Sequence, residues 1–207
     1  MKKKEAQTEQ KIFDSASEIF SKKGFDGARM QEIADHAGIN KALLHYYYRS
    51  KEKLFTAVFT LVAKKIFKKI FSFFSDPNIT LEEKIQMFYK EHISLLLKNP
   101  GLPAFLINET NKNPALIKQI FQSDEFSQII SVNKKQYIQG VNSGKFQDYG
   151  PVNFFINIVS MSLFPFTAHG IVKFIMAQQG FDFKEVMEQR KTVLPQFVHN
   201  ALKKQDK

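Results

Sequence analysis

Apolar side chains recur along most of this chain at the three- and four-residue spacing of an α-helix. Residues 5–22 carry one such stripe, formed by Ile12, Ala16, Ile19 and Phe20. Gly24 follows the stripe and is expected to end the helix. Two short helices are predicted next, at 30–36 and 41–47, with a tight turn at Gly38 between them and Asn40 as the N-cap of the second.

Longer helical patterns fill the rest of the chain. A helix capped by Ser50 should run to about Ser75, before an Asp-Pro-Asn break. Further helices are expected at 81–98, 103–112, 115–143 (one helix or a pair), 152–179 with a kink at Pro165, and 183–204 with a bend at Pro195. Alternation with period two is nowhere sustained. The fold class is therefore predicted as all-α, with a three-helix head at 1–50 and a helical body at 51–207.

Composition excludes several classes of protein. The 207 residues include 22 Phe and no Cys, so there is material for a core but none for a disulfide framework or a thiolate metal site. The five His show no ligand spacing, and no catalytic pairing or phosphate-binding glycine loop is apparent, so neither a cofactor nor enzymatic activity is expected. No apolar run reaches the length of a membrane span, and the charged start lacks a signal-peptide core, which suggests a cytoplasmic protein.

The net charge of +10 is compatible with nucleic-acid binding but does not locate the site. Residues 1–53 contribute only +3 of it, and the remaining residues contribute +7. The pattern at 28–47 is more informative. Two short helices joined through Gly38, with small Ala34 and Ala37 near their crossing, predict a helix-turn-helix whose second helix can enter a major groove. Its small core is expected to consist of Ile33, Ala34, Ile39 and Leu44.

The same region resembles the N-terminal head of TetR-family transcriptional repressors. The resemblance covers about residues 10–56. It is carried by Ile12–Phe20, Gly24-Phe25, Ile33-Ala34, Ala37-Gly38-Ile39-Asn40-Lys41, Leu44, Tyr47-Tyr48 and Ser50-Lys51-Glu52-Lys53-Leu54. It implies a homodimer that binds a pseudo-palindromic operator and is released by a small-molecule effector. An activator of the same family is the alternative within this class.

The resemblance also implies roles for individual residues. Lys41, Ala42 and Leu43 match positions that approach base edges, and Gln31 matches a supporting position that sometimes reads a base. Positions that mostly hold phosphates are matched by His45, Tyr46, Tyr47 and Lys51; Asn40 completes the predicted DNA-binding set together with Arg29.

The chain departs from the family pattern at three places. Ala28-Arg29 replaces the usual hydroxyl residue before the supporting helix, so its cap should be weak while Arg29 contacts phosphate. His45 stands where tyrosine is usual. Leu43 is apolar where a small or hydroxyl residue is common, which favours contact with a thymine methyl group.

The aromatic body is expected to enclose an apolar effector pocket. Its candidate lining is Phe88, His92, Phe105, Asn108, Glu109, Phe121, Asn157 and Met161. Glu109 either recognises a cationic effector or faces solvent at a helix end, and solvent is the preferred interpretation.

Two surfaces of the body have a predicted role. The last two helical segments, 152–179 and 183–204, carry more apolar surface than one face needs and should pair with their symmetry mates as the homodimer interface. The lysine-rich segment 61–74 resembles a membrane-surface helix, but a core-facing helix with a solvated edge is preferred, and no membrane partner is expected. We expect the helix from Ser50 to carry motion between body and head.

Overall fold

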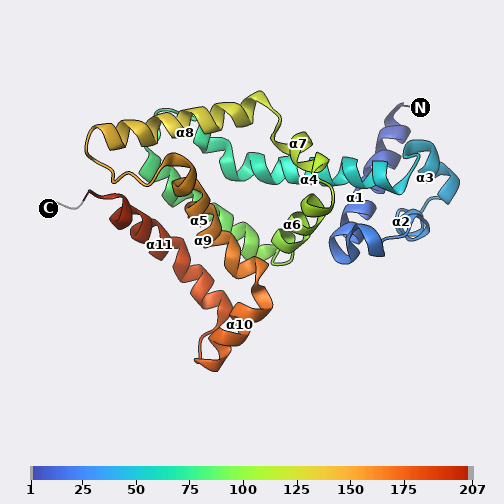
Figure 1. The fold of residues 1–207 in the computed structure, drawn as a ribbon. Helices are drawn as coiled ribbons and strands as arrows, with labels where there is room; N and C mark the ends of the chain where they lie inside the picture. The colour runs from blue at the N-terminus through green and yellow to red at the C-terminus, as the bar shows by residue number, and fades with distance from the viewer. Residues whose placement is uncertain (1, 205–207) are drawn as a thin grey trace. The chain divides into compact units, whose positions relative to one another are not determined.

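The computed structural model describes the backbone of residues 2–204 and the side chains of residues 5–64, 67–68, 72–118 and 121–204. This part of the chain is helical, with one isolated β-bridge between Phe146 and Lys203, so the all-α prediction is confirmed (Figure 1). The elements are α1 (Lys2–Gly27), α2 (Met30–His36), α3 (Lys41–Tyr47), α4 (Lys51–Phe71), the 3-10 helix η1 (Ser72–Ser75), α5 (Leu81–Lys98), α6 (Leu102–Lys112), α7 (Ala115–Phe121), α8 (Asp124–Asn142), α9 (Pro151–Thr167), α10 (His169–Gln178) and α11 (Phe183–Leu202).

Most predicted helix boundaries agree with the structure because local signals set them. Gly24 adopts φ 67° and interrupts α1, and Thr80 begins α5 with a capping box that it forms with Glu83. The segment 115–143 proves to be the pair α7 and α8, since the Ser123 side chain caps a new helix by accepting from the Phe126 amide. The kink expected at Pro165 differs from the structure. Helix α9 continues to Thr167, and the chain bends by 78° at Ala168 before α10.

Two compact units make up the chain. The first contains the residues up to Ile66 together with Phe105–Phe121, and the second contains Phe67–Ala104 together with the residues from Gln122 onward. The functional boundary expected at residue 50 stays a prediction.

The core of the first unit joins α1, α2, α3 and the first half of α4. Its fully buried side chains include Ile12, Ile33, Leu44 and Leu54, and the rings of Phe20 and Phe55 meet edge to face with 4.9 Å between their centroids. Helices α6 and α7 also contribute, since Leu116 is buried in this core and Phe105, Leu106 and Phe121 pack against it.

The second unit is built around α5, which packs along α11 and also against α8 and α9. Its buried residues are Leu81, Lys84, Ile85, Phe88, Tyr89, His92, Ile93 and Leu96. Lys84 is buried and forms no ion pair with a described residue, although the Asp76 carboxylate favours its charged form. Its Nζ donates to the Phe74 carbonyl at 3.1 Å and to Gln136 Oε1 at 2.9 Å. These bonds satisfy the carbonyl at the end of η1 and compensate part of the cost of burying an ammonium group.

No single helix in the described part of the chain is long and apolar enough to cross a membrane. Only α9 and α10 taken together reach the necessary length and hydropathy, and they are separated by the 78° bend.

Candidate nucleic-acid interface

Helices α2 and α3 form a helix-turn-helix whose turn depends on two residues. Gly38 has φ 66°, in the left-handed region that favours glycine, and the chain then returns to an extended conformation at Asn40. The Asn40 side chain accepts from the Leu43 amide at 2.7 Å and so caps α3. Helix α2 begins without a side-chain cap at Arg29, which confirms that this cap is weak.

The two faces of α3 differ sharply. Leu44 is wholly buried against Ile33 and Ala34, and Ile39 packs beside this cluster, so the small core predicted from the sequence is confirmed. On the other face Lys41 and Ala42 are exposed, Leu43 is 37% exposed and Tyr46 is 74% exposed. Helix α3 therefore presents a cation, a methyl group, a leucine and a phenol outward from a rigid support, which is the arrangement that reads a major groove.

Four other predicted DNA contacts lie on α3 or on the neighbouring α2. Arg29 is exposed at the start of α2, and the exposed Gln31 donates to Asp35 Oδ1 at 2.8 Å. His45 is half-buried, with its Nδ1 at 3.4 Å from the Arg49 carbonyl, and Tyr47 reaches the Glu5 carbonyl at 3.5 Å. The roles of these residues on DNA stay predictions. Arg49, exposed in the α3–α4 connection, is a cation that the sequence interpretation did not select.

Lys51 has a structural partner that the sequence did not suggest. Its Nζ donates to the Phe25 carbonyl at 2.9 Å and to the Ala28 carbonyl at 3.1 Å, and it lies 4.4 Å from the centre of the Phe25 ring. Two of the three ammonium protons therefore bind α4 to the last turn of α1 and to the residue that follows it. One proton remains for a phosphate.

The eight candidate pocket residues do not come together within one compact unit. Phe105, Asn108, Glu109 and Phe121 belong to the first unit, and Phe88, His92, Asn157 and Met161 belong to the second. Asn108 and Asn157 are exposed. The effector-binding role of this set stays a prediction.

Glu109 is only 6% exposed, so the interpretation that it faces solvent at a helix end is wrong. One of its carboxylate oxygens lies 3.6 Å from the position that a Cβ would occupy at Gly24. Nearby, Lys112 forms an ion pair with Asp26. Both contacts link α6 to the end of α1. Such contacts join residues far apart in the sequence, so helical periodicity does not reveal them.

His92 and Ser162 form a buried pair between α5 and α9. Nδ1 of His92 lies 2.9 Å from Ser162 Oγ, and Ser162 in turn donates to the Val159 carbonyl at 3.0 Å. The serine proton is therefore committed, which makes His92 the donor through Nδ1. The imidazole stacks on Phe88 with 4.8 Å between ring centroids. Burial lowers the pKa of His92 to about 4.

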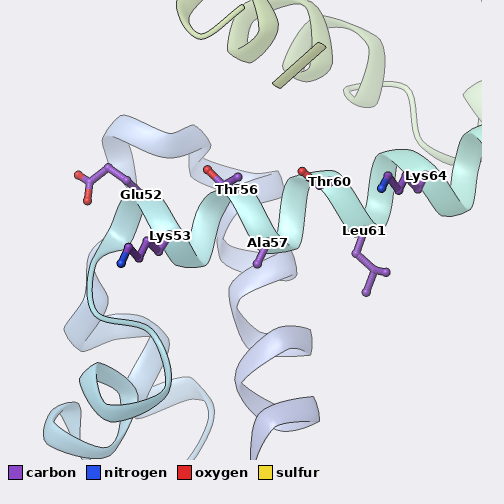
Figure 2. Close-up of a pocket in the computed structure, with 7 residues that line it drawn as sticks. All are labelled: Glu52, Lys53, Thr56, Ala57, Thr60, Leu61 and Lys64. Carbon is purple, nitrogen blue, oxygen red and sulfur yellow. The ribbon is translucent and has the colours of Figure 1, made fainter. Parts of the chain in front are cut away.

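An open depression of about 510 Å³ lies along α4 in the first unit. Its described lining residues all come from this helix, as Figure 2 shows: Glu52, Lys53, Thr56, Ala57, Thr60, Leu61 and Lys64. None of the eight candidate pocket residues lines it.

The lysine-rich segment 61–74 is only partly described, since the side chains of residues 65, 66 and 69–71 lie outside the described residues. Within the described part, Lys64 and Lys68 are exposed. Phe67 is half-buried and packs edge to face on Phe126, with 5.3 Å between ring centroids. These contacts favour the core-facing interpretation over a membrane-surface helix.

Known proteins similar to this chain are helix-turn-helix DNA-binding regulators, in agreement with the geometry of α2 and α3. Residues 12–58 match the family model described as bacterial regulatory proteins, tetR family. The chain is 43% identical over 51 residues to the transcriptional repressor NicS of Pseudomonas putida, a match covering 25% of this chain and 24% of NicS. It is 34% identical over 87 residues to IcaR of Staphylococcus epidermidis, a negative transcriptional regulator of the biofilm operon icaADBC, covering 39% of this chain and 43% of IcaR.

The likeness in three dimensions extends over nearly the whole chain. The crystal structure of the transcriptional regulator FadR of Bacillus subtilis in complex with stearoyl-CoA matches with a TM-score of 0.64 and 17% identity, covering 93% of this chain and 98% of FadR. The sequence matches span less than half the length of NicS and IcaR, whereas the fold is shared throughout. Residues 12–58 therefore match the DNA-binding head of tetR-type bacterial regulatory proteins, and the remainder of the chain shares the fold of the aligned regulator.

The adjacent residues Leu43 and Leu44 should differ in function: Leu44 is expected to stabilise the helix-turn-helix core, and Leu43 to contact DNA. Leu44→Ala removes a wholly buried side chain from the α2–α3 core and should cost about 2–5 kcal/mol of stability, with loss of DNA binding. Leu43→Ala, on the exposed face, should change stability by less than about 0.5 kcal/mol and alter the preferred DNA sequence. Urea unfolding and selection from random DNA measure the two effects, and equal destabilisation by both variants would contradict this account.

Replacing Lys51 should affect stability as well as DNA binding. Lys51→Ala leaves two carbonyl groups without their donor and should lower the free energy of unfolding by about 1–2 kcal/mol. Lys53→Ala is the matched control, because Lys53 is an exposed lysine in the same turn. Unfolding curves of the two variants make the comparison. Identical midpoints would show that the Lys51 bonds contribute nothing.

His92 should make the protein sensitive to acid. Its pKa is about 4 in the folded protein against an ordinary value of 6.5, so the unfolded chain takes up the proton first as the pH falls. The stability that neutral His92 provides is therefore complete above about pH 6.5 and is lost towards pH 4, by about 3 kcal/mol. His92→Gln should flatten this part of the stability–pH curve, whereas His199→Gln, at an exposed position, should not.

Proposed function

We propose that this protein is a homodimeric repressor that binds a pseudo-palindromic operator through α3 and is released by a small-molecule effector bound in the helical body. The observation that carries the proposal is the outward face of α3, where Lys41, Ala42 and Tyr46 are exposed above the buried Leu44. A two-fold dimer would present two such helices to successive major grooves.

Repression is favoured over activation by the relatives, since NicS is a repressor and IcaR a negative regulator. An activating role within the same family is the alternative. The complex of FadR with stearoyl-CoA supports control by an apolar or amphipathic effector. Such a regulator acts where its operator is, and we therefore expect it in the cytoplasm.

The apolar surface of the last three helices supports dimerisation through residues 152–179 and 183–204. Helix α10 buries none of its residues although its sequence is strongly apolar, and Phe174 is 65% exposed. On α11, Phe197 is 60% exposed and Val193 lies one turn before it, also exposed. On α9, Ile156 and Val159 are exposed as well. Extended apolar patches of this kind usually mark an interface, and pairing with a symmetry mate would cover this one.

A charge placed in this surface should separate the subunits. Sedimentation of the wild-type protein at micromolar concentration should give a dimer, and Phe197→Glu a monomer with unchanged helicity. Leu61→Glu, at an exposed apolar residue of α4, is the matched control and should stay dimeric. A monomeric wild-type protein would overturn this interface.

DNA selected from a random pool by the purified protein tests operator binding directly. The selected fragments should share a two-fold-related motif. Lys41→Ala should change the bases preferred in each half-site, whereas Lys184→Ala, at an exposed lysine of α11, should leave the motif unchanged. A protein that enriches no duplex sequence even at low salt would refute the proposed function.

A further inference from the structure

The second unit contains two buried polar groups that have no hydrogen-bond partner among the described residues. The Tyr89 side chain on α5 is fully buried, and its hydroxyl has no hydrogen-bond partner among the described residues. The same holds for the buried Nε of Arg190 on α11, whose charge acts on the Tyr89 phenol. Each such group costs stability unless something binds it.

Arg190 also makes a hydrogen bond that accounts for an arginine at this position. Its Nη2 donates to the Met161 carbonyl on α9 at 2.6 Å. In a regular helix that carbonyl would accept from the amide of residue 165, but Pro165 has no N–H. Arg190 therefore supplies the donor that the proline removes. This hydrogen bond uses Nη2 and leaves Nε without a partner among the described residues.

The guanidinium lacks a counter-ion. No carboxylate in the described part of the chain forms an ion pair with Arg190, and the Tyr89 phenol that influences the Arg190 pKa is itself neutral because burial raises its own pKa. Burial lowers the pKa of Arg190 and raises the pKa of Tyr89, as expected for groups removed from water without an ionic partner. The neighbouring His92 is held neutral by burial and does not compensate the cation.

Buried apolar side chains flank Tyr89 and Arg190 on their own helices. One turn to either side of Tyr89, α5 carries Ile85 and Ile93, and the turns flanking Arg190 on α11 carry Met187 and Leu194. All four are buried. A molecule that reached both polar groups would thus meet two hydrogen-bond donors and one positive charge within an otherwise apolar setting.

We propose that Tyr89 and Arg190 bind the acid group of an amphipathic carboxylate, an effector with one anionic head and an apolar chain. The inference rests on the proposed function and names the class of its effector. One carboxylate oxygen accepts from the Tyr89 hydroxyl and the other from Arg190 Nε–H, and the anion supplies the missing counter-charge. The apolar chain lies among the isoleucine, methionine and leucine side chains.

Such a ligand would bind where α11 packs along α5, two helices that lie side by side in Figure 1. Helix α11 also carries Phe197 of the proposed dimer surface. Entry of a ligand must displace α11 relative to α5, and this displacement would reach the partner subunit. The acid-binding pair is thereby connected to the spacing of the two DNA-binding heads.

The test compares three ten-carbon probes on the purified full-length protein, each below its micelle concentration. Decanoate carries the anion, 1-decanol is neutral, and decyltrimethylammonium is cationic. Calorimetric titration should show decanoate binding at least ten times more tightly than either of the others, since a hydrogen-bonded charge pair contributes that much. Decanoate should also raise the Tm.

The Tyr89→Phe variant distinguishes a role of the hydroxyl in ligand binding from a role in stability. A stabilising hydroxyl would lower the Tm when removed, whereas a ligand-binding hydroxyl without a partner would not. Removing a hydroxyl without a partner should leave the Tm of the unliganded protein unchanged or raise it by a few degrees. The same change should weaken decanoate binding at least fivefold and leave 1-decanol binding unchanged. Arg190→Gln should weaken decanoate binding tenfold or more, with Arg190→Lys intermediate because it keeps the charge.

Equal affinity for decanoate and 1-decanol would overturn the proposal, as would a Tyr89→Phe variant with unaltered decanoate affinity. Failure of all three probes to bind would overturn it as well. Binding of the wild-type protein to its selected DNA, measured without any probe, separates these outcomes from failure of the proposed function itself. The Tyr89 variant should bind that DNA normally, since Tyr89 lies outside the first unit.

Discussion

A helix of seven residues cannot hold its shape alone in water, so everything that α3 does depends on its attachment to the helices beneath it. Three features provide that attachment. The Leu44 side chain is buried against Ile33 and Ala34, Gly38 permits the sharp turn from α2, and Asn40 caps the first turn. Because these three use only the inner face and the N-terminus of α3, the outer face is free to vary. A family can thereby keep one support while each member reads a different operator.

The support extends beyond the three helices of the head. Lys51 at the start of α4 donates to the Phe25 carbonyl in the last turn of α1 and to the Ala28 carbonyl just after it. Glu109 and Lys112 of α6 lie against the end of α1. Leu116 of α7 enters the same core. A change in the position of α6 would therefore act directly on the unit that carries α3. Motion could thus reach the head through α6 as well as through α4, the helix expected from the sequence to carry it.

The sequence predicted the head far better than the interior of the body, for a physical reason. Helix limits such as those of α2, α3 and α5 follow from local signals, namely a glycine in the turn, a capping side chain and an apolar stripe. Contacts of Glu109 with α1, or of Arg190 with α9, join residues far apart in the chain. Helical periodicity predicts that a residue is buried, but it does not predict which helix packs against that residue. For that reason Glu109 was expected in solvent, and neither Tyr89 nor Arg190 was selected.

Pro165 shows how one helix-breaking residue can determine the polarity of a site two helices away. A proline inside a helix frees a carbonyl, and a buried free carbonyl requires a donor. Arginine meets that need through Nη2, whereas a lysine or glutamine would satisfy the carbonyl and bring fewer spare donors. The consequence is a guanidinium whose buried Nε has no hydrogen-bond partner among the described residues and whose charge acts on the similarly unpartnered Tyr89 phenol, where apolar side chains would be more stable. Stability alone does not account for keeping both groups unpaired, but an anionic ligand that pairs with them does.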